Sequence, residues 1–268
     1  MRQPERVQCL NQSQGGMVTT SRAAMCVTLF AILAAGCAPA PSAAQPASSS
    51  AVASPSPAAP NVMLGGMEQT LAAGTYPWVL DRPGIDFPTV RFTVPDGWAS
   101  GARFTYRLRP EPEEAAVVMG FWDVGELYGH PCKWRGTLFD PGPTVDDLAT
   151  ALVDIPLRNA TQPVDVTLGG YAGKYVEWTV PTDIETDERG NFVDCDMDGG
   201  EHYFESWIGD PSGWGGDRYH QGPGQLDQLW ILDVDGARFV IGASSMPSAT
   251  AEERTELLDV VESIEFER

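Results

Sequence analysis

The chain has 268 residues, 43% of them hydrophobic, with eight Trp and ten Phe among them. This apolar content is enough to bury a sizeable core, so intrinsic disorder, collagen and coiled coil are excluded for most of the chain. Seventeen Lys and Arg stand against 37 Asp and Glu, a formal net charge of −20, and such a surface repels phosphate backbones. Nucleic acid is therefore excluded as a partner.

Residues 1–37 are predicted to be an export leader. The uncharged stretch Ala23–Ala35, at ~1.5 Å per residue, is too short to cross ~30 Å of hydrocarbon, which is typical of a signal peptide rather than a spanning helix. It runs into Leu33-Ala34-Ala35-Gly36-Cys37, which resembles the lipobox of bacterial lipoproteins. The resemblance implies that Cys37 receives fatty acids such as palmitate and becomes the mature N-terminus. The alternative is an ordinary signal peptide cleaved at a nearby alanine.

The segments on either side of the leader's apolar stretch are also distinctive. Residues 1–16 are longer and more polar than a normal signal-peptide start, which leaves Met1, Met17 or Val18 as the translation start. Residues 38–60 are almost entirely Ala, Pro and Ser, a composition that cannot bury a core and predicts an extended, disordered linker. We expect the remainder, 61–268, to fold as one extracytoplasmic domain.

Within 61–268 most apolar patterning has a period of two, which predicts strands with one face buried. Asp235-Gly236 lies between two such alternations and favours a hairpin with a type I′ turn, and Gly169-Gly170 predicts a second turn. The predicted strands, in chain order, are Val90–Val94, Phe104–Leu108 after the turn Pro95-Asp96-Gly97, Ala115–Trp122, Val164–Leu168, Lys174–Val180, Tyr203–Ile208, Leu229–Val234, Ala237–Ala243 and Glu265–Glu267.

Two segments carry helix-start signals. Thr144 is followed three residues later by Asp147, and Thr250 is followed by Glu253, so each threonine is expected to cap a helix. We therefore predict an α+β fold, a mainly antiparallel β-sheet with two or more packed helices.

Several sequence motifs resemble known proteins. The Leu71–Tyr76 and Val90–Trp98 segments, with Phe87-Pro88, Gly222-Pro-Gly224 and Leu229–Gly236, are similar to uncharacterised extracytoplasmic lipoproteins of actinobacteria. The Val-Pro-Asp-Gly-Trp strand end and the closing Leu257–Phe266 are also similar to domains with the Mog1/PsbP-like fold, a sheet flanked by helices. Neither resemblance implies a catalytic residue for this chain.

Cys132 and Cys195 are the two cysteines of the expected exported domain. An even pair outside the cytoplasm predicts a disulfide bond. The alternative is a cysteine nucleophile assisted by His130 or His202, but no catalytic signature surrounds either cysteine.

Residues 194–205 match the Asp-x-Asp-x-Asp-Gly-x5-Glu pattern of calcium loops. Alternating carboxylates, with Gly199 for a sharp turn, suit a hard cation such as Ca²⁺. The carboxylates in the pattern are Asp194, Asp196, Asp198 and Glu205. The alternative is an acidic, solvated turn without metal, because the whole domain is rich in Asp and Glu.

The stretch 209–224 is dense in glycine and proline, and its aromatic residues Trp214, Tyr219 and His220 are candidates for binding a partner. The alternative is that Trp214 covers a sheet edge. No nucleophile elbow, phosphate loop or dinucleotide motif occurs in the sequence. The sequence therefore indicates a lipid-anchored extracytoplasmic binding module for a cell-envelope protein or glycan, without evident catalysis. A cell-envelope hydrolase and a calcium-stabilised structural domain are the alternatives.

Overall fold

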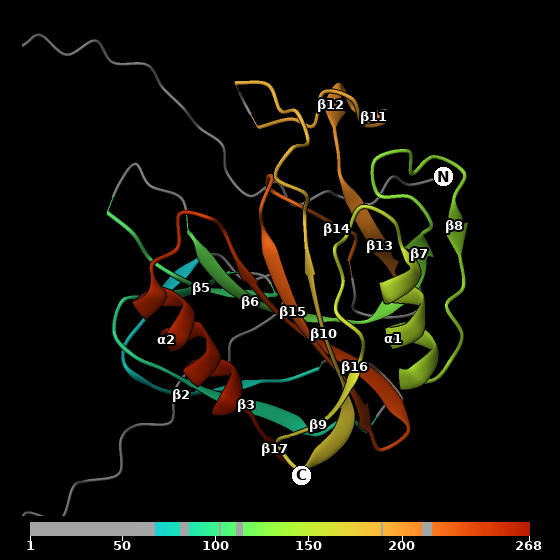
Figure 1. Ribbon diagram of the computed structural model, residues 1–268. Helices are drawn as coiled ribbons and strands as arrows, with labels where there is room; N and C mark the ends of the chain where they lie inside the picture. Colours follow the sequence, from blue (N-terminus) through green and yellow to red (C-terminus); the bar gives the residue numbers. More distant parts are fainter. Residues whose placement is uncertain (1–67, 81–85, 102, 111–114, 189, 211–215) are drawn as a thin grey trace, which may run out of the picture. The chain divides into compact units, whose positions relative to one another are not determined.

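Antiparallel strands dominate the fold (Figure 1). The computed structural model describes residues 68–80, 86–101, 103–110, 115–188, 190–210 and 216–268. All of these belong to one compact unit. Their helices and antiparallel strands confirm the α+β prediction, and strands far outweigh helices among them. The leader, Cys37, the linker and Trp214 lie outside the described residues.

The largest sheet in this part of the chain has eight antiparallel strands in the order β1-β4-β5-β6-β16-β15-β10-β9. Its centre is the long hairpin of β15 and β16, joined by Asp235 and Gly236 with φ of 56° and 86°, as a type I′ turn requires. The strand bounds are β1 Gln69–Leu71, β4 Trp98–Gly101, β5 Phe104–Arg107, β6 Val117–Trp122, β9 Val164–Leu168, β10 Tyr171–Thr179, β15 Leu226–Val234 and β16 Ala237–Ser245.

Two helices of the described chain cover opposite faces of this sheet (Figure 1). Helix α1, Val145–Asp154, packs Leu148 and Leu152 on one face, and α2, Ala251–Glu262, packs Leu257 and Val261 on the other. Each begins with the predicted capping box, on Thr144 for α1 and on Thr250 for α2.

Because both faces are covered, successive residues of a central strand enter different cores. On β15, Trp230 and Leu232 join the core under α2, while Leu229 and Ile231 join the core under α1. The expectation of one buried face is therefore wrong for the central strands. A helix on each face gives both sets of side chains an apolar neighbour.

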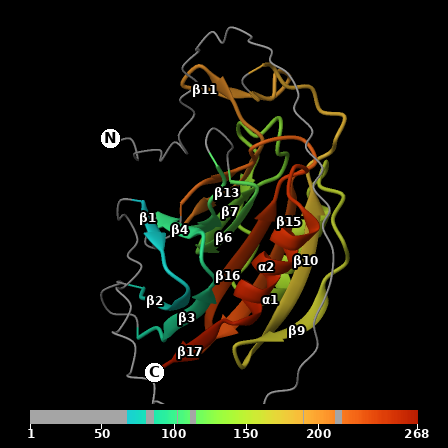
Figure 2. The same cartoon turned by 90° about the vertical axis from the view of Figure 1, so that its left-hand side faces the viewer.

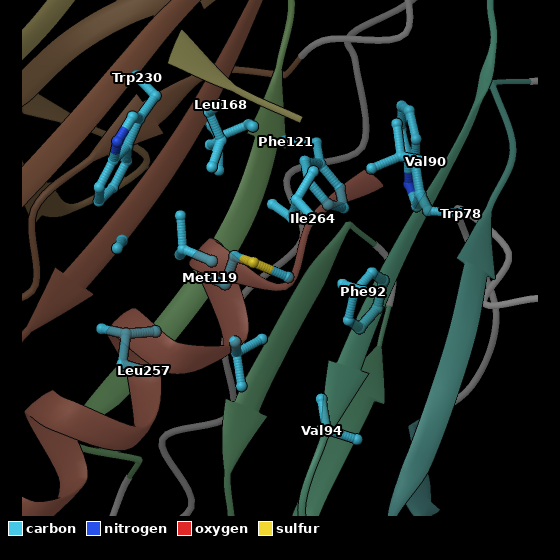
Figure 3. Close-up of a cluster of buried hydrophobic side chains, with 14 of the residues drawn as sticks. Trp78, Val90, Phe92, Val94, Met119, Phe121, Leu168, Trp230, Leu257 and Ile264 are labelled. Atoms are coloured by element: carbon cyan, nitrogen blue, oxygen red, sulfur yellow. The ribbon is translucent and has the colours of Figure 1, made fainter. Parts of the chain in front are cut away.

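Two smaller sheets complete the main architecture (Figure 2). A three-stranded sheet, β17-β3-β2, packs with α2 against the large sheet, and Figure 3 shows Phe92 and Val90 facing the same core as Met119 and Leu257. A four-stranded sheet has the order β14-β13-β7-β8, and β11 and β12 form a short hairpin. The bounds are β2 Gly74–Trp78, β3 Thr89–Val94, β7 Val124–Tyr128, β8 Leu138–Phe139, β11 Met197–Asp198, β12 Glu201–His202, β13 Glu205–Gly209, β14 Arg218–Tyr219 and β17 Glu265–Glu267.

One strand, β4, is absent from the sequence prediction. The turn at Pro95-Asp96-Gly97 leads into β4, which pairs with β5, the strand predicted from Phe104. The reason is Trp98, whose fully buried ring and indole N–H, donated to Glu256, hold the intervening segment in the sheet. Neither α1 nor α2, the helices of the described residues, is long and apolar enough to span a lipid bilayer.

Candidate functional site

A groove of about 440 Å³ lies between helix α1 and the segment around strand β8. One wall is the exposed ring of Phe139 with Pro141, and the other is helix α1 with Ala151, followed by the C-cap residue Ile155. Phe139 is 37% exposed, and its neighbour Leu138 is 39% exposed. Consecutive exposed apolar residues beside a cavity are typical of a surface that binds another molecule.

The local sequence explains why the groove has a defined end. The segment from Asp140 to Thr144 turns sharply at Gly142, which has a φ of 95° and lies so close to Asp147 that a side chain would clash there. Arg238 of β16 donates to the carbonyl oxygens of Gly142 and Thr144. These contacts fix the start of α1 against β16, so the groove is built on rigid elements.

Three aspartates line the groove along the helix: Asp146, Asp147 and Asp154. The backbone N–H of Thr144 donates to the Asp147 carboxylate, and the Thr144 hydroxyl accepts from the backbone N–H of Asp147. Hydrogen bonding with the Thr144 side chain and backbone lowers the pKa of the Asp147 carboxyl. Asp146 and Asp154 are exposed. The groove is therefore negatively charged above an apolar floor.

The carboxylates of the groove can be compared with those of glycoside hydrolases. The backbone positions of Asp146 and Asp154 are two turns apart on α1, about 12 Å along the axis at 1.5 Å per residue. The paired carboxylates of glycoside hydrolases lie about 5–9.5 Å apart, and one of them needs a raised pKa, whereas that of Asp147 is lowered.

A second polar group lies inside the protein and joins the two main sheets. Asp227 of β15 accepts hydrogen bonds from Arg218 of β14, from His220 and, at 2.9 Å, from the indole N–H of Trp178. Arg158, in the turn after α1, donates to the hydroxyl of Ser206 on β13 at 2.9 Å. The Arg158 guanidinium lies 4.3 Å from the Trp178 ring centre and 4.7 Å from that of Phe204.

In this buried network, both burial and neighbouring charged groups shift the pKa values. Burial would raise the pKa of Asp227, but Arg218 and His220 outweigh burial and hold it well below its usual range. Burial, together with Arg158, lowers the pKa of His220 to about 4, so its ring is neutral at pH 7. Burial also lowers the pKa of Arg158 to about 9, which leaves it charged at pH 7.

Ser206, His220 and Asp227 have the connectivity of a catalytic relay. The Ser206 hydroxyl is 3.2 Å from Nδ1 of His220, whose Nε2 faces Asp227. However, Ser206 and Asp227 are fully buried and His220 is 3% exposed, so no substrate can reach the hydroxyl. The group connects β13 and β14 of the four-stranded sheet to β15 of the large sheet through buried hydrogen bonds.

The predicted disulfide between Cys132 and Cys195 is confirmed. It links the loop after β7 to the segment before β11, and its cysteines pack with Phe192 and Phe204 in a small core. Since both sulfurs are bonded, neither cysteine is a nucleophile in this state.

The calcium-loop carboxylates are placed on different elements. Asp196 accepts from the backbone N–H of Arg135 at 2.9 Å, Asp198 lies in the β11–β12 hairpin, and Glu205 is 2% exposed at the start of β13. Gly199, with a φ of 61°, makes the turn of that hairpin. Among the residues whose positions are described, no three His, Cys, Asp or Glu side chains form a group that could hold a metal. The structure therefore does not bring the pattern together as a calcium loop.

The aromatic candidates of 209–224 are also separated. His220 is part of the interior network and is not available at the surface, because its ring completes the hydrogen bonding of Asp227. Tyr219 is half-buried on β14, with its ring 5.1 Å from that of Tyr203. The segment is less irregular than its glycine and proline content indicates, since β14 pairs with β13.

The sequence analysis did not predict the groove between α1 and β8 or the buried network around Asp227. Two signals for the groove are present in the sequence: the apolar pair Leu138-Phe139 before a turn, and an acidic residue, Asp154, at the end of α1. Arg158 has no sequence signal. It is flanked by left-handed backbone at Leu157 and Asn159, with φ of 58° and 44°, a conformation that Leu rarely adopts and Asn accepts more readily.

Comparison with known proteins finds no family model that matches the chain and no curated protein that is similar to it. Among solved structures the chain matches LpqN, a protein of Mycobacterium tuberculosis described as involved in cell envelope biogenesis. The identity is 12%, the match covers 73% of this chain and 91% of LpqN, and the TM-score is 0.35. A likeness of this degree transfers no function.

Proposed function

We propose that this protein is a lipid-anchored extracytoplasmic binding module, held to the membrane by Cys37 and carrying its binding site in the groove between α1 and β8. The single observation that carries the binding role is this groove, which combines an exposed aromatic wall with a carboxylate-lined helix. The lowered pKa of Asp147, where a glycoside hydrolase needs a raised one, and the buried Ser206 support binding without catalysis.

The extracytoplasmic location has independent support. The disulfide between Cys132 and Cys195 belongs to an oxidising compartment, since thiols stay reduced in the cytoplasm. The lipobox-like end of the leader and the uncharged linker 38–60 suit a domain held at a distance from a membrane. The sequence resemblances to actinobacterial lipoproteins and to the Mog1/PsbP-like fold belong to the same proposal, with a cell-envelope protein or glycan as partner.

Anchoring is tested by labelling bacteria that express the full chain with an alkyne analogue of palmitate. We expect label on the wild type and on Cys26→Ser, whose cysteine leaves with the leader, and none on Cys37→Ser. Equal labelling of Cys37→Ser would disprove the anchor.

Binding is tested by co-sedimentation of the purified, oxidised protein with isolated cell envelopes. Phe139→Asp should lower the bound fraction, because it places a charge on the apolar wall of the groove. Val164→Asp is the matched control, since Val164 is 54% exposed on the edge strand β9 and lines no part of the groove. Equal loss in both variants would remove the groove from the binding role.

A further inference from the structure

The lining of the groove has a net negative charge. Its lining includes three aspartates and no basic side chain. Lys174 contacts Asp146 at 3.3 Å but also binds Asp165 at 2.6 Å, so it is shared. Asp154 has no hydrogen-bond or ion-pair partner within the described ranges, and it is the last residue of α1, where the helix dipole disfavours a carboxylate. A cation bound here would pair with the Asp154 carboxylate and would offset its unfavourable interaction with the helix dipole.

The spacing of Asp146 and Asp154 along α1 matches an extended chain. Asp146 and Asp154 are about 12 Å apart along the helix. An extended peptide advances about 3.3 Å per residue, so residues i and i+4 are about 13 Å apart and point to the same side. Residue i+2 also points to that side and meets the apolar part of the groove beside Phe139 and Ala151.

Strand β8 supplies a reason for the occupant to be a peptide. It lies at the edge of the four-stranded sheet and pairs only with β7 among the described strands. Edge strands with exposed apolar residues, here Leu138 and Phe139, are typical acceptors for an added strand. The Phe139 ring also favours a nearby cation.

From this geometry we propose that the groove binds an extended, basic segment of a partner protein, in which two Lys or Arg residues four positions apart flank a central apolar residue. The basic side chains pair with Asp146 and Asp154, and the apolar residue packs against Phe139. The chain's net charge of −20 steers such a partner toward it. This inference rests on the proposed binding function and names the chemistry of its ligand.

The test uses the purified, oxidised protein and a fluorescent, amidated heptapeptide Gly-Lys-Ser-Leu-Ser-Lys-Gly in an anisotropy titration. Exposed ion pairs predict that Asp146→Asn and Asp154→Asn each raise the Kd about threefold, with a further rise as salt increases. The matched control is Glu262→Gln, which removes an exposed carboxylate at the same final position of α2 and should leave the Kd unchanged. A peptide of the same composition with its two lysines adjacent should bind at least threefold more weakly.

Other outcomes overturn the proposal in separable ways. Equal affinity for the peptides with spaced and with adjacent lysines would show that the spacing does not select the ligand. An unchanged Kd in Asp154→Asn would show that this carboxylate does not select it. If a peptide with both lysines replaced by serine binds equally well and is lost with Phe139→Asp, the groove binds, but not by charge. No binding of any peptide, together with equal sedimentation of Phe139→Asp and wild type, would remove the proposed function as well.

Discussion

Replacing Asp227 with asparagine tests whether the buried network stabilises the junction of the two sheets. The change keeps the volume of the side chain but removes the buried charge that faces Arg218. It also replaces one acceptor oxygen with an amide NH₂ group, which cannot accept a hydrogen bond. Trp178 and Gln225 donate to Asp227 at 2.9 and 3.0 Å, so the new NH₂ group would face a donor. Removing one partner of a buried ion pair costs about 3–5 kcal/mol, because the remaining charge stays buried without compensation. At about 2–4 °C per kcal/mol for a domain of this size, Tm should fall by about 6–20 °C.

Urea unfolding at pH 7, followed by tryptophan fluorescence on the oxidised protein, measures the free-energy difference directly. The control is Asp259→Asn, an exposed position on α2 where a loss within about 0.5 kcal/mol is expected. A loss below about 1 kcal/mol for Asp227→Asn, with an unchanged slope, would show that the network contributes little. The assignment of a stabilising role to His220 and Arg158 would then fail.

Three further predictions concern acid, the disulfide and calcium. Folding lowers the pKa of His220 from 6.5 to about 4, so between these pH values the unfolded chain binds a proton that the folded chain does not. The urea midpoint of unfolding should therefore fall as the pH is lowered from 6.5 to 4, and His220→Gln should weaken this pH dependence. Replacing Cys132 and Cys195 by serine should cost about 4 kcal/mol in urea unfolding, the chain-entropy value for a separation of 63 residues; no loss would contradict that account. Calcium at about 1 mM should leave Tm, measured by calorimetry, unchanged, since the 194–205 carboxylates do not converge; a site with a Kd near 1 μM would add about 4 kcal/mol.

Local signals in the sequence determined the elements whose geometry is set by neighbouring residues. Thr144 and Thr250 begin their helices because each capping box closes within one turn of chain. Asp235 and Gly236 make the central hairpin because only a few residue types accept left-handed backbone at both positions. The cysteine pair was predictable from number and compartment alone. None of these conclusions needs a contact between distant segments.

The two candidate sites depend on such contacts. Phe139 and Asp154 form a groove only because β8 joins the four-stranded sheet while α1 packs on the large one. Arg158 and Asp227 share a buried network only because β13 and β15 meet in the interior. A charged residue has the same letter whether it lies in water or inside a core, and only packing from distant strands decides which. The tertiary structure therefore turned His220 from a candidate surface residue into part of the core.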